Sequence, residues 1–259
     1  MQDLRVTTVQ TTVAWENIDA NLSMFTDLIS SLSNTDLVVL PELFSTGFTM
    51  NTTALAEPMD GKAVVWMRNT AARLGAVITG SLIIEENGHY YNRLVWMRPD
   101  GTCETYDKRH LFRMMNEHQH FSGGNKRLQV ELKGWQIRPL VCYDLRFPVW
   151  SRQEKGNRYD LLVYTANWPE PREIAWRTLL MGRAHENQSY VVGVNRVGDD
   201  GNGVPFSGHS MVVEPKGNVI STTQPHETRV ETVTLSRKEL DRFREKFPMW
   251  MDADDYTVG

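Results

Sequence analysis

The chain has 259 residues, of which 41% are hydrophobic and 23% charged, a composition typical of a folded protein with a sizeable core. Its net charge of −4 and scattered lysines and arginines disfavour nucleic acid or an anionic membrane surface as a partner. No signal-peptide pattern opens the chain, and its apolar runs are shorter than the ~20 residues that span a bilayer. With only two cysteines, we expect a cytoplasmic protein with reduced thiols.

Strands and helices alternate in the first part of the chain, up to a long segment without periodicity. The spacing of apolar residues and the turn signals predict, in order, a strand at 4–10, an amphipathic helix at 18–34, a buried strand at 35–42, a helix at 62–74, and strands at 76–84, 90–97 and 103–108. Residues 110–126 show neither period and predict a long loop. Such a loop in a compact domain is often functional.

The second part of the chain continues with strands that follow one another closely. The patterns predict strands at 128–134 and 135–142, a helix near 147–155, a strand at 159–167, a helix at 172–187, strands at 189–197 and 209–215, a late hairpin of 214–221 with 228–235, and a short helix around 240–247. The glycine-rich segment 198–208 lacks the strand-before, helix-after context of a phosphate loop, so we interpret it as a turn.

The succession of strands through tight turns determines the expected fold class. A strictly parallel sheet does not allow such direct connections, so a mixed sheet is required. This many strands predicts an α/β protein with two mixed sheets packed face to face and helices outside. No change of composition marks a linker, and we expect a single domain over 1–259 with 248–259 as a C-terminal tail.

The stretch RPLVCYDLRFP places Cys142 where an apolar strand breaks into charge. A free cysteine at a strand end is often a small buried hydrophobe. Alternatively, the sharp turn that must follow would expose the thiol and direct backbone N–H groups toward its target, as at a nucleophile elbow. A thiol of ordinary pKa ~8.5 is mostly protonated at neutral pH and would need a base or a nearby cation. The strand-end position alone leaves both interpretations open.

Three other polar residues are candidates for the same site. Glu42 follows the apolar DLVVLP, where burial would raise its pKa toward that of a useful base, although a solvated loop residue or a neighbour of a helix N-cap is an equal alternative. Lys108 ends the predicted strand 103–108, and Glu117 lies in the long loop. Taken singly, Lys108 and Glu117 are typical of solvated structural residues.

The segments PELFSTGF, YDKRHLF and VCYDLRFP together resemble the nitrilase superfamily of carbon–nitrogen hydrolases. The resemblance implies an α-β-β-α sandwich and a Glu–Lys–Cys triad of Glu42, Lys108 and Cys142, which occur here in the family's order and spacing. It also implies that Glu117 is the family's second glutamate. The chain departs from the family pattern in HLFRMMNEHQHFSGG and at Gly182 and His185.

The resemblance also carries an expected chemistry. The CYDLRFP form is similar to that of the omega-amidases, which hydrolyse the side-chain amide of 2-oxoglutaramate and related ω-monoamides of dicarboxylic acids. The expected mechanism has Glu42 as base, Lys108 and the backbone N–H of Tyr143 as oxyanion donors, and Glu117 positioning either Lys108 or the substrate amide. The resemblance implies no cofactor or metal. It implies at least a homodimer, which we expect to form through the helices after Cys142 and before His185.

Several alternatives accompany this hypothesis. Arg146 is a candidate for binding the substrate's distant carboxylate in bidentate fashion, or else forms an ion pair with Asp144 or Asp160. His110, His118 and His120 have an H-x-H spacing without cysteines, a weak zinc pattern, so we expect solvated loop histidines. The competing functions are an N-carbamoyl-amino acid hydrolase or nitrilase with the same triad, and a catalytically silent binding protein that kept the fold.

Overall fold

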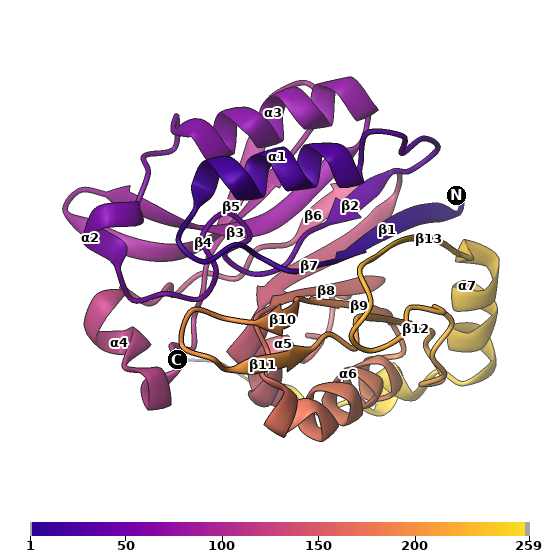
Figure 1. The fold of residues 1–259 in the computed structure, drawn as a ribbon. Helices are drawn as coiled ribbons and strands as arrows, with labels where there is room; N and C mark the ends of the chain where they lie inside the picture. The colour runs from indigo at the N-terminus through magenta and orange to yellow at the C-terminus, as the bar shows by residue number, and fades with distance from the viewer. Residues whose placement is uncertain (1, 257–259) are drawn as a thin grey trace.

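The computed structural model describes residues 2–256, which form two β-sheets packed face to face between layers of helices (Figure 1). The first sheet has the order β13-β1-β2-β3-β4-β5. Its strands are β1 (Leu4–Gln10), β2 (Leu37–Val39), β3 (Val77–Glu86), β4 (His89–Met97), β5 (Cys103–Asp107) and β13 (Arg229–Leu235). Parallel and antiparallel pairs occur together in this sheet, as the tight turns between predicted strands require.

The second sheet has the order β12-β9-β8-β7-β6 and is also mixed. Its strands are β6 (Val130–Leu132), β7 (Trp135–Val141), β8 (Leu161–Ala166), β9 (Tyr190–Asn195) and β12 (Met211–Val213). A separate hairpin of β10 (Val197–Asp199) and β11 (Pro205–Ser207) occupies most of the predicted glycine-rich turn. The predicted fold class, an α/β sandwich of two mixed sheets with helices outside, is confirmed.

Helices cover the outer faces of both sheets (Figure 1). Over the first sheet lie α1 (Ile18–Leu28) and α3 (Lys62–Leu74), and over the second lies α6 (Glu173–Asn187), while α7 (Arg237–Lys246) packs at the end of the sandwich. Short helical turns are α2 (Thr52–Leu55), η1 (Arg113–Met115), α4 (Glu117–His120), η2 (Cys142–Arg146), α5 (Pro148–Ser151), η3 (Glu170–Arg172) and η4 (Met249–Asp252).

The alternation of side chains along each strand explains these layers. Leu37 and Val39 of β2 point toward the other sheet and join the cluster between the sheets, whereas Val38 joins the cluster under α1 and α3. On the second sheet, Leu162 packs under α6 against Trp176. Both faces of the central strands are therefore buried, which is why they are nearly continuous apolar runs.

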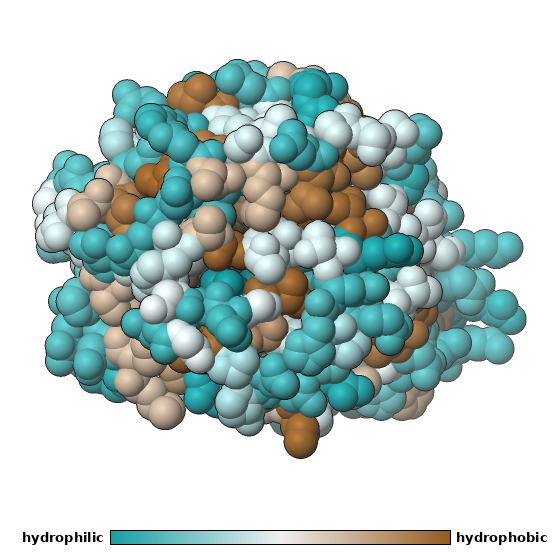
Figure 2. Space-filling model, viewed as in Figure 1, coloured by the Kyte–Doolittle hydropathy of each residue, from teal (hydrophilic) through white to brown (hydrophobic). Residues whose placement is uncertain are grey.

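The distribution of polar and apolar side chains agrees with these layers. On the face shown in Figure 2, hydrophilic side chains predominate, and apolar residues show between them in small groups. Most apolar side chains of the described residues are instead found in the buried clusters. No helix within residues 2–256 is long and apolar enough to cross a membrane.

Several predicted elements require correction. The expected hairpin of 214–221 with 228–235 is wrong: β13 pairs along its whole length with β1, because the outer edge of β1 is free to accept it. Residues 214–221 form a turn with a single bridge from Val219 to Val213. The helix expected near 147–155 ends at Ser151, since Arg152 is extended, and the helix expected to reach residue 34 ends at Leu28. The loop 110–126 contains η1 and α4.

Candidate active site

Side chains from four strand ends meet at one edge of the sandwich. Glu42 follows β2 of the first sheet, Lys108 directly follows β5 of the same sheet, and Cys142 directly follows β7 of the second sheet. Asn167 follows β8, the parallel neighbour of β7. The carboxyl ends of parallel strands are where α/β sheets place their ligand sites, and here two sheets contribute to one such site.

Cys142 lies at a sharp turn between β7 and η2. Its φ of +41° is in the left-handed region, which is unfavourable for a side-chain-bearing residue and costs about 1–3 kcal/mol. The buried Asp144 holds this turn, because its carboxylate accepts hydrogen bonds from the backbone N–H of Val141 at 3.1 Å and of His110 at 3.0 Å, and from the Tyr106 hydroxyl at 2.7 Å. The strained elbow expected from the sequence is thus present, and Cys142 lines a cavity.

A compact charge cluster lies beside the cysteine. The Lys108 ammonium donates hydrogen bonds to Glu42 Oε1 at 2.8 Å and to the two oxygens of Glu117 at 2.9 and 3.0 Å. Asn92 Nδ2 donates to both carboxylates, at 2.8 Å to Glu42 and 3.2 Å to Glu117. All four side chains are buried, with exposures of 0–1%. Each charge in this cluster is therefore paired within the protein, as buried charges must be.

Asn167 connects the cluster to the cysteine. Its backbone N–H donates to Glu42 Oε2 at 2.8 Å, and its side-chain Nδ2 donates to the carbonyl of Glu42. Its own carbonyl accepts the hydrogen bond of the Cys142 thiol, with Sγ at 3.7 Å. The base candidate and the nucleophile candidate are thus fixed against the same residue.

Burial and charge determine the protonation states in this cluster. Burial alone would lower the pKa of Lys108, but the attraction of Glu117 and Glu42 outweighs it, and the pKa is raised above its ordinary value. Burial raises the pKa of Glu117, although Lys108 opposes this. Burial also raises the pKa of the Cys142 thiol well above its ordinary value, and the negative charge of Glu42 raises it further. Cys142 is therefore a neutral thiol at neutral pH and needs a base to become a nucleophile.

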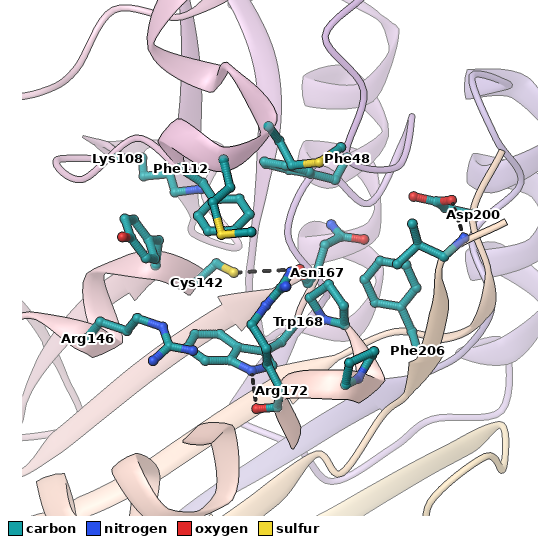
Figure 3. A pocket seen from close by; sticks show the side chains of 16 residues that line it. Phe48, Lys108, Phe112, Cys142, Arg146, Asn167, Trp168, Arg172, Asp200 and Phe206 are labelled. Atoms are coloured by element: carbon teal, nitrogen blue, oxygen red, sulfur yellow. Dashed lines mark hydrogen bonds between the residues drawn. The ribbon is translucent and has the colours of Figure 1, made fainter. Parts of the chain in front are cut away.

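The cavity above Cys142 has a volume of about 210 Å³ and a largely apolar wall that includes several aromatic rings (Figure 3). This is small for a ligand pocket, since pockets for drug-sized ligands typically have volumes of ~300–1,000 Å³, and it suits a small substrate. Its lining residues are Phe48, Lys108, Phe112, Met114, Met115, Cys142, Tyr143, Arg146, Asn167, Trp168, Pro169, Pro171, Arg172, Asp200, Val204 and Phe206.

Arg146 and Tyr143 both line this cavity. The alternative of an ion pair between Arg146 and Asp144 or Asp160 is wrong. Asp144 is hydrogen-bonded at the elbow, and Asp160 pairs with Arg237 at 2.9 Å and with another arginine of α7. The guanidinium of Arg146 instead lies over the Trp168 ring.

The histidines of the 110–126 loop differ in their surroundings. His110 is half-buried, with its Nδ1 2.7 Å from Asp144 and its ring stacked on Phe147, so the expectation of a solvated side chain is wrong there. His118 is half-buried and His120 exposed. Within the described part of the chain, no three His, Cys, Asp or Glu side chains are placed to hold a metal ion.

The structure brings Glu42, Lys108, Glu117 and Cys142 together as the sequence predicted, but sequence reasoning missed Asn92. It lies inside β4, in the apolar run YYNRLVWM. A polar residue within such a run was a usable signal, because a buried amide must find hydrogen-bond partners. Asn167 was missed likewise, although it ends the predicted strand 159–167.

Comparison with known proteins agrees with this geometry. Residues 5–245 match the carbon–nitrogen hydrolase family. The chain is 46% identical over 258 residues to Omega-amidase YafV of Escherichia coli strain K12, covering all of both chains. It is 34% identical over 220 residues to a 2-oxoglutaramate amidase of Bacillus subtilis, covering 84% of each.

A solved structure has the same fold as this chain. A CN-hydrolase superfamily protein from Xanthomonas campestris, with an arsenic adduct in its active site, superposes with a TM-score of 0.97 at 43% identity, over 100% of both chains. The chain belongs to the carbon–nitrogen hydrolase family, the nitrilase superfamily that its motifs resemble.

Proposed function

We propose that the protein is an omega-amidase, which hydrolyses the terminal amide of small dicarboxylic acid monoamides such as 2-oxoglutaramate and releases ammonia. The observation that carries this proposal is the thiol of Cys142 at a strained elbow, beside a buried cluster of Glu42, Lys108 and Glu117. The names of the relatives at 46% and 34% identity support the substrate class. The small volume of the cavity supports a short substrate.

In the proposed mechanism, Glu42 accepts the proton of the Cys142 thiol while Sγ forms a bond to the amide carbon. The carbonyl electron pair moves onto oxygen, and the resulting oxyanion accepts hydrogen bonds from Lys108 Nζ and from the N–H of Tyr143. One such donor typically contributes ~2.7–4 kcal/mol to transition-state stabilisation. Glu117 holds Lys108 in place through two hydrogen bonds.

The second half of the reaction uses the same base. Protonated Glu42 donates its proton to the leaving nitrogen as the C–N bond breaks, which releases ammonia and leaves a thioester on Cys142. Glu42 then takes a proton from water, whose oxygen attacks the thioester carbon. Breaking of the C–S bond, with return of the proton to Sγ, regenerates the thiol and frees the carboxylic acid product.

Arg146 is proposed to bind the substrate's distant carboxylate. Its guanidinium lines the cavity and makes no hydrogen bond or ion pair with the described residues, and the Trp168 ring lies 4.8 Å from its Cζ. A guanidinium in this position can bind a carboxylate through two N–H groups and so fix the orientation of the amide at the other end.

A panel of candidate substrates tests the proposal. Ammonia release is measured with ω-amides, α-amides, nitriles and N-carbamoyl amino acids, and carbon dioxide is measured in parallel. We expect ammonia without carbon dioxide, with the highest kcat/KM for ω-amides that carry a free carboxylate. Carbon dioxide release would indicate a carbamoyl hydrolase, and a preference for nitriles would indicate a nitrilase.

Two cysteine variants serve as a matched pair in this assay. Cys142→Ala is expected to abolish the activity, whereas Cys103→Ala, at an exposed free thiol remote from the cavity lining, is expected to keep it. Activity that survives in Cys142→Ala would contradict the mechanism. A wild-type protein that hydrolyses none of the four classes would favour the silent binding protein.

We also propose that the protein assembles at least as a homodimer through α5 and α6. Val149 on α5 is 54% exposed and Ile174 at the start of α6 is 75% exposed, which supports an apolar contact on these helices. Sedimentation equilibrium would measure the mass, and a monomer at micromolar concentration would contradict the assembly.

A further inference from the structure

Two half-buried arginine side chains line the partly exposed side of the cavity, called its mouth below, and have no acidic partner among residues 2–256. Arg146 of η2 and Arg172 of η3 both line the cavity and are half-buried. Neither guanidinium forms an ion pair or donates a hydrogen bond to residues 2–256. By contrast, the buried arginines Arg93, Arg138 and Arg196 all donate hydrogen bonds to protein oxygens. A guanidinium carries five N–H donors, so two unused sets of donors face the same small cavity.

Aromatic rings hold both guanidiniums in place. The Cζ of Arg146 lies 4.8 Å from the centroid of the Trp168 ring, and that of Arg172 lies 5.3 Å from the centroid of Phe112. Trp168 also fixes the backbone of Arg172, because its Nε1 donates to the Arg172 carbonyl at 2.7 Å. The backbone of Trp168 is in turn held by the side chain of Asn195. Figure 3 shows both arginine side chains at the Trp168 side of the cavity.

The other charges around the cavity do not neutralise this pair. Lys108 is already paired with Glu42 and Glu117. Asp200 lines the same cavity, but its Oδ1 accepts hydrogen bonds from the backbone N–H groups of Asn202 and Val204 at 2.8 and 2.9 Å and so stabilises its own turn. Even with the negative charge of Asp200 counted, the two guanidiniums leave one excess positive charge at the mouth of the cavity, which an anionic ligand would neutralise.

We propose that Arg172 is a second specificity-determining residue, which binds the substrate's distant carboxylate jointly with Arg146. The inference rests on the proposed function, since it concerns the acid end of the same substrate. A carboxylate offers about four lone-pair sites on two oxygens, enough to accept hydrogen bonds from two guanidiniums at once. Because η2 follows β7 and η3 follows β8, the two arginines belong to different segments of the chain. The carboxylate would therefore be held from both segments.

Arg172→Ala tests this inference against Arg177→Ala, a matched control on the exposed side of α6 that does not line the cavity. For 2-oxoglutaramate we expect Arg172→Ala to lower kcat/KM about 10- to 100-fold, mainly through KM, the effect of losing one hydrogen bond between charged groups. For pentanamide, an uncharged amide of similar length, we expect less than a twofold change. Arg172→Lys should recover part of the loss.

The role of Arg172 in carboxylate binding can also be measured without turnover. In the Cys142→Ala background, glutarate is titrated calorimetrically, and Arg172→Ala is expected to raise its Kd about tenfold while Arg177→Ala leaves it unchanged. An unchanged Kd, or an equal loss of kcat/KM on the charged and uncharged amides, would overturn the role of Arg172. Glutarate binding that depends on Arg172 in a protein that hydrolyses no ω-amide would uphold this role and reject the proposed function.

Discussion

Around Lys108, at the closed end of the cavity, two carboxylates, one ammonium and one amide are hydrogen-bonded to one another. At the mouth of the cavity, two guanidiniums lie over aromatic rings and have no acidic partner within the part of the chain that the structure describes. The closed end is shielded from water, where an unpaired charge is very costly, so its charges are paired in the folded protein. The mouth is partly solvated and tolerates unpaired cations. The difference suggests that the closed end is organised for chemistry before substrate arrives, and that the mouth is completed by the substrate.

The largest effect is expected from breaking the charge balance of the closed end. Lys108→Met leaves Glu42 and Glu117 buried side by side without a cation. We expect kcat to fall by at least about 10³-fold, because the oxyanion donor is lost, and the free energy of unfolding to fall by about 3–5 kcal/mol. Enzyme assays and urea denaturation measure the two effects.

The control for this variant is Lys62→Met. Lys62 pairs with Asp19 at 2.9 Å on the surface, with both side chains exposed. We expect its removal to leave kcat and the denaturation midpoint unchanged, since surface pairs contribute little. Equal effects of the two substitutions would contradict the distinction between the buried cluster and the surface.

A smaller effect is expected from Asn92→Ala, which removes an uncharged member of the same cluster. Asn92 donates to both carboxylates, and its hydrogen bond to Glu117 favours the charged form of that group. Its loss raises the pKa of Glu117 further above the ordinary value, so this carboxylate is protonated at a higher pH as the pH falls. We expect kcat to fall about 10- to 100-fold and the acid limb of kcat/KM to move to higher pH.

The pH profile separates positioning from mere stability. Asn125→Ala, at an exposed asparagine, is the matched control and should keep the wild-type profile. A stability defect without a shift of the acid limb would mean that Asn92 only fills space. Asn92→Asp, which adds a third buried carboxylate, should be worse than Asn92→Ala.

The mildest test changes no residue of the closed end and follows the protonation of Cys142 in a Cys103→Ser protein. Because burial and Glu42 raise the pKa of this thiol, the proton stays bound as the pH rises through the ordinary value of ~8.5. We expect the ultraviolet absorbance of the thiolate to appear only above that pH. Thiolate absorbance near pH 7 would show that Lys108 already ionises Cys142 and that no base is needed.

The strand-end residues of the cluster were predictable because they follow apolar runs directly. Glu42, Lys108 and Cys142 each come at or just after the end of a predicted strand, and the family resemblance placed them in one site. The turn at Cys142 followed from the abrupt change between the strand of 135–142 and the charged residues after it. These are local properties of the sequence, set by alternation and by the turn that follows a buried strand.

Asn92 and Arg172 could not be assigned from local pattern. The face of β4 on which Asn92 lies depends on its antiparallel register with β3, in which Asn92 is opposite Ile83. Arg172 follows a proline-rich segment and is far from Arg146 in the chain. Trp168 links the two in the folded protein, because its ring lies under the guanidinium of Arg146 and its Nε1 donates to the backbone carbonyl of Arg172. The pairing of β13 with β1 was missed for the same reason, since it joins the two ends of the chain.

The sequence by itself determined the succession of most strands and helices, the mixed character of the sheets and the elbow at Cys142, because apolar periodicity and turn residues act over a few positions. The tertiary structure decided which charged side chains form ion pairs and which are available to a ligand. Lys108 pairs with Glu42, 66 positions away, and with Glu117, 9 positions away, while Arg146 pairs with no acidic residue of 2–256 although Asp144 is two residues away. Ion pairing depends on the distance between two groups in space and on the exclusion of water around them. Neither quantity follows from the residues next to them in the sequence.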